Sequence, residues 1–419
     1  MGLTSTLRTI SLFACVFALF ACDSASGPDG GVGDGAVPTQ DGEAPTDGGA
    51  VDCSGRPADA PVTRSEVGMV HDAARDRLII YGGNTAASER CGVPPSEIVA
   101  EMWAFHFDCG SWEQLTPAGG PGALARHAVV ADTANDRMLV FGGRASSSSY
   151  SNALWAFDLT TDTWSELATS GTAPPPVAEA TANLDVERNR LLVFGGDPGG
   201  FTGSDGLYAL DLEAMAWSRI DAADAPSPRL YHASAIVGDE LLIFGGAAGF
   251  NPPYLNDVHA FDLTSETWRA VTTTGTGPNP RFGAELVPDE DSGRVLVMFG
   301  HDDTNLGNRN DMYALDLATS TWSNLHEGDT FNNPPTGMCE FPADFTTLEE
   351  GSPERRYSIG LAVSADGQAF IFGGKADCGY LNDVWRIDSA TGDWASVRAS
   401  TGGEVCLRTG RTDCGSLCF

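Results

Sequence analysis

The chain has 419 residues and a formal net charge of −33, with 57 acidic residues against 24 basic ones. Such strong negative charge favours solubility and repels polyanions, so nucleic acid is excluded as an expected partner. Beyond a short N-terminal segment, no apolar run is long enough to cross a bilayer as a helix. We therefore expect a folded domain and no membrane-spanning helix.

The chain begins with what has the form of a targeting segment, residues 1–21. Its apolar part, residues 10–21, is too short to span a membrane as a helix, which needs about 20 apolar residues. The segment runs into Leu-Phe-Ala-Cys at residues 19–22, which resembles the lipobox of bacterial lipoproteins. This resemblance implies that Cys22 carries a lipid and anchors an exported protein in the bacterial cell envelope, in the periplasm or at the surface. An ordinary secretory signal cleaved near Ala21 is the alternative.

Residues 22–52 are rich in Gly, Asp and Pro and contain no basic residue. Such a composition cannot bury enough apolar surface to offset the entropy of ordering, so we expect a disordered acidic linker. The folded domain is predicted at residues 53–398, and a cysteine-rich tail at residues 399–419.

One pattern recurs six times within the predicted domain. An apolar run ends in paired glycines, and an aromatic residue or histidine then stands nine residues before a tryptophan. The second unit reads as strands at residues 127–131, 138–141 and 153–159, with a fourth that opens at Trp164. Several short strands in a unit of this length are typical of a propeller. The residue pairs are Trp103 and Trp112, Trp155 and Trp164, Tyr208 and Trp217, His259 and Trp268, Tyr313 and Trp322, and Trp385 and Trp394.

The repeat resembles the kelch motif, in which an arginine precedes the first strand and the Gly-Gly pair follows the second. This resemblance implies an all-β fold, a six-bladed kelch-type β-propeller with four antiparallel strands per blade, as in the central domain of galactose oxidase. The repeated aromatics and glycines are then structural. Two departures stand out: His301 is interpreted as the replacement of the second glycine of unit five, and unit three lacks the leading arginine.

The leading arginines are the first candidates for a binding site. The resemblance places them around the mouth of the central channel, where guanidinium groups can bind carboxylates. In the alternative interpretation, each arginine pairs with an acidic or backbone group of its own or the next blade. Two histidines on the inner strands share this region and either face the channel or are satisfied internally. These predicted ligand-binding residues are Arg64, Arg126, Arg229, Arg281, Arg356, His127 and His232.

The sequence gives only weak support for metal binding or catalysis. His301, Asp302 and Asp303 are weak candidates for a calcium site, although short runs of this kind are usually turns. No catalytic arrangement is recognisable. We therefore expect no cofactor and favour a protein that is not an enzyme.

Eight cysteines remain beyond Cys22, an even number that suggests disulfide bonds in an exported protein. Cys91, Cys339 and Cys378 fall at the same end of blades that become neighbours when the ring closes, so we expect two of these three to pair, with a Cys339–Cys378 bond favoured. A Cys91–Cys109 bond is disfavoured, since the third strand separates the two by roughly 20 Å. The candidates are Cys53, Cys91, Cys109, Cys339, Cys378, Cys406, Cys414 and Cys418.

The sequence thus predicts an exported, monomeric binding module that recognises a protein or glycan of the cell envelope or extracellular space through the loop-rich mouth face. The alternative is an enzyme or receptor for a small anionic sugar that uses an arginine-lined mouth, since some bacterial kelch proteins are sialic-acid epimerases. A purely structural envelope component is the third possibility.

Overall fold

A computed structural model describes residues 59–86, 96–249, 251–302, 307–332, 346–364, 366–376 and 379–400. The chain divides into two units, Met1–Ala50 and Val51–Phe419, and all the described residues belong to the second. The predicted signal segment, the lipidation site Cys22 and the tail at residues 401–419 therefore lie outside the described residues. Within those residues, no helix is long and apolar enough to span a membrane.

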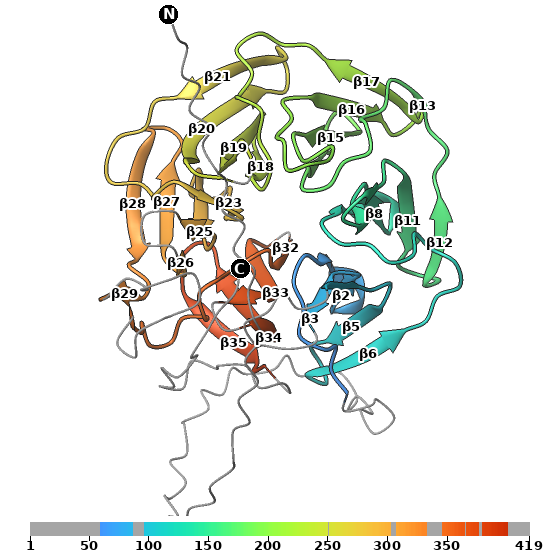
Figure 1. Ribbon diagram of the computed structural model, residues 1–419, viewed down its shortest axis with the longest axis horizontal. Coiled ribbons are helices and arrows are strands. Elements are labelled where there is room, and N and C mark those ends of the chain that lie inside the picture. The colour runs from blue at the N-terminus through green and yellow to red at the C-terminus, as the bar shows by residue number, and fades with distance from the viewer. Residues whose placement is uncertain are drawn as a thin grey trace, which may run out of the picture. The chain divides into compact units, whose positions relative to one another are not determined.

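The second unit is a ring of six sheets, each built on four antiparallel strands, and two of the sheets carry a fifth, short strand (Figure 1). This confirms the predicted six-bladed propeller. Each blade is formed by consecutive strands of the chain, and the first strand of each lies nearest the central axis. The strands of blades 1 to 3 are β1 (Gly68–Asp72), β2 (Arg77–Tyr81), β5 (Met102–His106) and β6 (Ser111–Leu115); β7 (Ala128–Asp132), β8 (Arg137–Phe141), β11 (Leu154–Asp158) and β12 (Thr163–Glu166); and β14 (Thr181–Asp185), β15 (Arg190–Phe194), β16 (Leu207–Asp211) and β17 (Ala216–Ile220).

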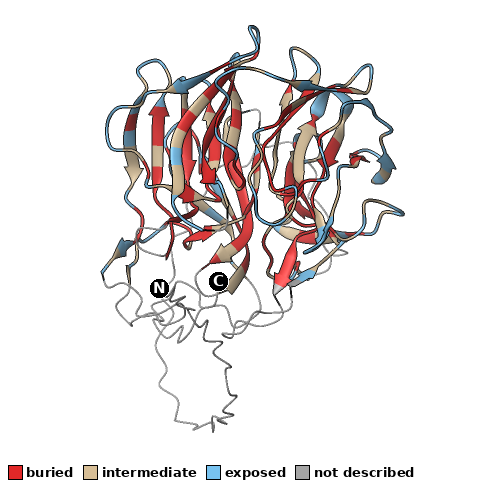
Figure 2. Ribbon diagram, turned by 45° about the horizontal axis from the view of Figure 1, so that its top comes forward, coloured by how far each residue is buried: buried red, intermediate tan, exposed pale blue. Residues whose placement is uncertain are grey.

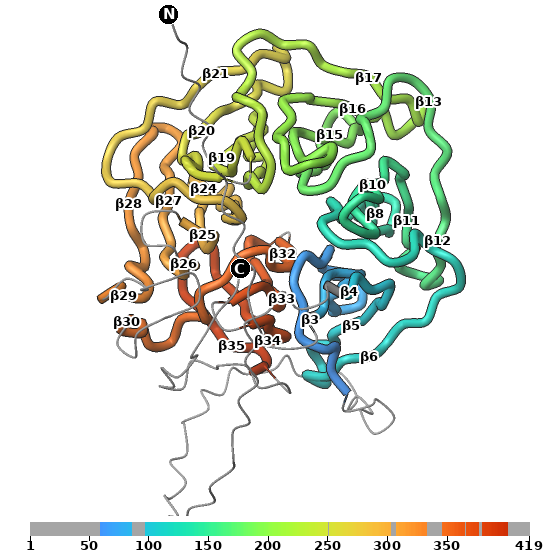
Figure 3. Tube along the Cα trace, viewed as in Figure 1, coloured from blue at the N-terminus to red at the C-terminus, as the bar shows by residue number. Residues whose placement is uncertain are grey.

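Blades 4 to 6 repeat this order and complete the ring, as the chain trace in Figure 3 shows. Their strands are β18 (Ala233–Val237), β19 (Glu240–Ala247), β20 (Tyr254–Asp262) and β21 (Thr267–Val271); β23 (Glu285–Asp289), β24 (Arg294–Met298), β27 (Met312–Asp316) and β28 (Thr321–His326); and β32 (Gly360–Val363), β33 (Gln368–Ala376), β34 (Gly379–Asp388) and β35 (Trp394–Arg398).

Short strands and two 3-10 turns extend the loops between these blade strands. They are η1 (Ala73–Arg75), η2 (Thr133–Asn135), β3 (Asn84–Ala86), β4 (Ser96–Ile98), β9 (Arg144–Ser146), β10 (Ser149–Tyr150), β13 (Ser170–Gly171), β22 (Arg281–Phe282), β25 (His301–Asp302), β26 (Gly307–Asn308), β29 (Thr330–Phe331), β30 (Thr346–Thr347) and β31 (Arg356–Tyr357).

The second strand of each blade is a continuous apolar run because it is buried on both faces (Figure 2). A left-handed residue ends each run, where the chain passes close to the next blade. A side chain at Gly373 would meet the carbonyl oxygen of Arg64 at 2.6 Å, so glycine is required there. In blade 5, however, Phe299 takes the place of the first glycine with a φ of 59°, and Gly300 keeps the second. The interpretation of His301 as the replaced glycine was wrong by two positions.

Blade 6 closes the ring by packing directly against blade 1. Met69 and Ile80 of blade 1 share one apolar cluster with Phe370 and Phe372 of blade 6. Each such buried side chain contributes about 1.5–3 kcal/mol. The backbone N–H of Arg64 also donates to the carbonyl of Leu381 at 2.9 Å. Each blade is built from strands that follow one another in the chain, so this junction rests on packing and loop hydrogen bonds.

Candidate functional site: an acidic collar around the propeller axis

Six residues, one from each blade, form a ring around the propeller axis, just before the innermost strands begin. We call this ring the collar. Each lies two residues before the innermost strand and adopts a left-handed φ between 52° and 64°, which turns the chain into that strand. For a residue other than glycine, this conformation costs about 1–2 kcal/mol. The collar consists of Glu66, Arg126, Glu179, Tyr231, Gly283 and Ser358.

The collar is held together by its own backbone. The N–H of Glu66 donates to the carbonyl of Ser358 at 2.9 Å, and the N–H of Arg126 donates to that of Glu66 at 3.1 Å. Glu179 and Gly283 donate in the same way to the preceding collar residues at 3.0 Å and 2.8 Å. Because the backbone fixes the ring, each blade is free to place a different side chain on the axis.

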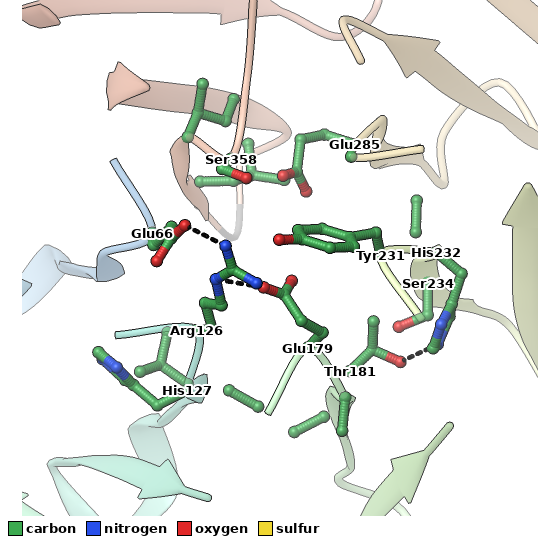
Figure 4. Close-up of a pocket in the computed structure, with 18 of the residues that line it drawn as sticks. Glu66, Arg126, His127, Glu179, Thr181, Tyr231, His232, Ser234, Glu285 and Ser358 are labelled. Carbon is green, nitrogen blue, oxygen red and sulfur yellow. Dashed lines mark hydrogen bonds and ion pairs between the residues drawn. The ribbon is translucent and has the colours of Figure 1, made fainter. Parts of the chain in front are cut away.

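The collar surrounds a cavity of about 240 Å³, shown in Figure 4, whose lining comes from all six blades. Sites for drug-sized ligands have roughly 300–1,000 Å³. The cavity is therefore suited to one side chain or a small ion.

Arg126 lies at the centre of the collar between two carboxylates. Its Nη2 is 2.7 Å from Oε1 of Glu66, and its Nε is 2.8 Å from Oε1 of Glu179. A second guanidinium, that of Arg144, reaches Glu66 at 3.4 Å, and the ring of Tyr231 covers Arg126 at 5.1 Å. Burial lowers the pKa of Arg126, but Glu179 and Glu66 outweigh it and raise that pKa well above its usual value. Arg126 is thus a permanent cation that is already neutralised.

Glu285, the first residue of β23, adds a third carboxyl group to the cavity (Figure 4). Among the described residues it has no hydrogen-bond or ion-pair partner. Burial, with a smaller contribution from Glu179, raises the pKa of Glu285 to about 8. Burial also raises the pKa of Glu179, against the attraction of Arg126, whereas Arg126 and Arg144 overcome burial and lower the pKa of Glu66. Near neutral pH the free cavity therefore favours a proton on Glu285, which has no cation beside it, whereas Glu179 has the guanidinium of Arg126 at 2.8 Å to favour its charged form.

The two predicted histidines line the cavity and pack between blades. The Nε2 of His232 is 2.9 Å from Oγ1 of Thr181 on the neighbouring blade, and the ring of His127 meets the ring of Tyr81 edge-on at 5.3 Å. Burial lowers the pKa of His127 to about 4, and burial together with Arg229 lowers the pKa of His232 to about 3. Both rings are neutral near pH 7.

Four of the five predicted arginines do not face the channel. Their side chains are fully buried inside the blades, where each donates to the carbonyl oxygen of the residue in the first-glycine position and forms an ion pair with a carboxylate near the third strand. The alternative interpretation, internal pairing, therefore describes these four, and their burial does not favour ligand binding. The pairs are Arg64 with Glu101, Arg229 with Asp257, Arg281 with Asp311, and Arg356 with Asp383.

Arg126 is not the equivalent of these arginines. It lies two residues closer to its strand than they do, and Leu124 and Val177 occupy the arginine position in blades 2 and 3. The expected ring of guanidiniums at the mouth is therefore corrected to a single channel-facing arginine. An alignment of His127 with His232 would have shown this, because it pairs Arg126 with Tyr231 and not with Arg229.

Comparison with known proteins agrees with this architecture. The model described as "KLHDC2/KLHL20/DRC7 Kelch-repeats domain" matches residues 50–185, 92–287 and 170–345, and the Kelch motif matches residues 361–399. The chain belongs to the kelch-repeat family.

Kelch-repeat relatives resemble this chain over much of the propeller. Acyl-CoA-binding domain-containing proteins 4 and 5 of Arabidopsis thaliana are 31% and 32% identical over 60% and 54% of this chain. The matches cover only 37% and 33% of those two proteins, about a third of their length. Kelch domain-containing protein 10 of Xenopus tropicalis is 26% identical over 67% of this chain and 66% of its own length.

The weak metal candidates of this kelch propeller are engaged in other contacts. His301 Nδ1 is 2.9 Å from Oδ1 of Asn308, and the buried Asp302 pairs with Arg309. Asp303 lies outside the described residues. In the part of the chain that the structure describes, no group of three His, Cys, Asp or Glu side chains is arranged to hold a metal ion.

The cysteine predictions fall mainly in parts of the chain that are not described. Cys109 forms a disulfide bond, and its partner lies outside the described residues. The other candidates, which also lie outside, are Cys53, Cys91, Cys339, Cys378, Cys406, Cys414 and Cys418.

Proposed function

We propose that this kelch propeller is a binding module for a protein partner, which it engages with the face that carries the collar. The observation that carries the proposal is the axial cavity, because its lining comes from all six blades and its size suits one inserted side chain. Long loops on a rigid scaffold commonly carry binding, and a central anchor residue in a pocket commonly dominates the energy of a protein interface.

The predicted alternative, a receptor or enzyme for an anionic sugar, depended on exposed arginines. Arg64, Arg229, Arg281 and Arg356 are fully buried, and the carboxylates of Glu66 and Glu179 already neutralise Arg126. A ligand carboxylate would also meet the carboxyl of Glu285. These contacts favour a protein partner over an acidic sugar.

Random peptides displayed on phage and selected on the full chain test the proposal. Ser358→Phe places a bulky ring on the collar, while Ser320→Phe makes the same change at the same left-handed φ in the turn between β27 and β28. We expect the enriched peptides to bind the wild type and Ser320→Phe with equal affinity, and to bind Ser358→Phe at least tenfold more weakly. Equal binding to both variants would contradict a partner site at the collar.

We further propose, from residues 10–22 alone, that a lipid on Cys22 holds the propeller at a bacterial cell envelope. The relatives named above are plant and vertebrate proteins and give this anchor no support. Mass spectrometry of the expressed protein would detect a diacylglyceryl group on Cys22. Membrane association that survives Cys22→Ala would argue against the anchor.

A further inference from the structure

We propose that the collar cavity binds an alkylammonium group through Glu285, supplied by a lysine side chain or the N-terminus of the protein partner. The inference rests on the proposed function for the source of the amine. It does not depend on that function for the chemistry of the cavity, which can be tested with a small amine.

The charge balance of the cavity is the first argument. Three carboxyl groups, those of Glu66, Glu179 and Glu285, line the cavity. The two nearby guanidiniums of Arg126 and Arg144 pair with Glu66 and Glu179. One carboxyl group, that of Glu285, is left over. With a proton on Glu285 the group of side chains is neutral, and a single bound cation can take the place of that proton without changing the net charge.

The position of Glu285 is the second argument. Glu285 is half-buried at the start of β23, where its carboxyl lines the cavity, and among the described residues it has no hydrogen-bond or ion-pair partner. A carboxylate withdrawn from water is costly unless it is paired. In the free protein the group avoids this cost by holding a proton. An ammonium group would replace that proton with an ion pair and a charge-assisted hydrogen bond.

The remaining lining suits an ammonium head on a short apolar chain. An ammonium group has three donors, and the Ser358 hydroxyl and the Glu179 carboxylate line the same cavity as Glu285 (Figure 4). The apolar side chains of Val67, Met69 and Ile359 also line it and can contact the methylene groups. A compact point charge fits this narrow space better than a planar guanidinium, which needs a fork of acceptors.

Other guests fit the same observations less well. An anion would meet three carboxyl groups and one arginine that is already paired at 2.7 Å and 2.8 Å. A metal ion is not favoured either, since the described side chains include no arrangement of three acidic, histidine or cysteine ligands. A neutral guest would leave Glu285 without an ionic partner.

Calorimetric titration of the full chain with n-butylammonium chloride tests the inference directly. We expect saturable binding to the wild type, at least tenfold weaker binding to Glu285→Gln, and no binding of n-butanol. Glu290→Gln is the matched control, because Glu290 is exposed in the β23–β24 turn and the change removes the same charge. Binding to Glu285→Gln as tight as to the wild type would overturn the inference, as would tighter binding of n-propylguanidinium than of n-butylammonium.

A second measurement uses only the wild type, so its result does not depend on whether Glu285→Gln folds. Titrations of the wild type at pH 7, in two buffers with different ionisation enthalpies, count the protons exchanged on binding. We expect the release of close to one proton, because the ammonium group displaces the proton that Glu285 holds. Binding without proton release would exclude Glu285 as the acceptor.

Modified peptides separate this inference from the proposed function. In the selected peptides, lysine is replaced by norleucine and the N-terminus is acetylated, so that no ammonium group remains. If the affinity of these peptides for the collar is unchanged, the result would support protein binding and overturn the ammonium inference. Binding of n-butylammonium with no peptide able to compete would support the ammonium site and overturn the protein source.

Discussion

The half-buried carboxyl of Glu285 leads to a prediction about stability that can be tested without a ligand. In the folded protein, burial raises its pKa from the ordinary 4.5 to about 8. The folded state then binds more protons than the unfolded state between these two values, so stability falls as pH rises through that window. At about 1.4 kcal/mol for each pH unit, ionised Glu285 costs up to about 5 kcal/mol above pH 8.

Glu285→Gln removes this ionisation while keeping the shape of the side chain. We expect the variant and the wild type to be nearly equal in free energy of unfolding near pH 4.5. The variant should gain about 1.4 kcal/mol over the wild type for each unit from pH 5 to pH 8. Urea unfolding followed by tryptophan fluorescence measures both proteins across this range.

The comparison separates Glu285 from the histidines, Arg126 and Tyr231, and the measured difference includes the coupling of Glu285 to Glu179, whose pKa is also raised to about 8. His127 and His232 are present in both proteins, and the pKa values of Arg126 and Tyr231 lie well above the window. Glu66 and Glu179 contribute to both profiles as well. A difference between variant and wild type that stays constant from pH 5 to pH 8 would refute the reasoning, and Glu290→Gln should follow the wild type throughout.

Three further predictions concern the scaffold. Arg281→Met leaves Asp311 buried without its cation and should cost about 3–5 kcal/mol in urea unfolding, most of it recovered when Asp311→Leu is added, whereas Arg269→Ala breaks an exposed pair and should cost under about 1 kcal/mol. Phe299→Gly should be less destabilising than Phe299→Ala by about 1 kcal/mol in the same assay, because the φ of 59° suits glycine; a larger cost for glycine would contradict the corrected register. His232→Phe should flatten the loss of stability as pH falls below 6.5, since the wild-type ring, with a pKa of about 3, must stay neutral in the fold; parallel profiles would exclude this.

The fold could be predicted because the repeat encodes packing that every blade shares. The apolar second strands and the tryptophans nine residues after an aromatic residue are buried or half-buried against the neighbouring blade, so each unit carries the same pattern. At Phe299 the repeat pattern failed to identify the residue that takes the first-glycine position. Phe299 stands where the backbone demands a left-handed residue, and the phenylalanine compensates for the strain by packing its ring 5.4 Å from that of Trp394.

The collar could not be predicted in this way because its backbone, and not its side chains, is repeated. A left-handed position next to the axis accepts Glu, Arg, Tyr, Gly and Ser in turn, so the collar has no sequence signature. Arg126 was assigned to the wrong register because an arginine just before an inner strand looks like the structural arginine of the other blades. The alignment of His127 with His232 was the available signal.

The sign of the charge at the axis follows from which arginines have partners within their own blades. Four arginines near the mouth suggest a positive site, but each is placed against a carboxylate by the same blade that supplies it, as in the bidentate pair of Arg356 with Asp383 at 2.6 Å and 2.8 Å. Such pairs add no net charge to the channel. The net charge of the cavity is set by the collar side chains, which pair with one another across blades, and by Glu285, which has no ion-pair partner among the described residues. An acidic guest would meet this carboxyl group, whereas a basic guest can pair with it in place of the proton. The arginines in the sequence suggested an anion site, but the pairing seen in the structure favours a cation.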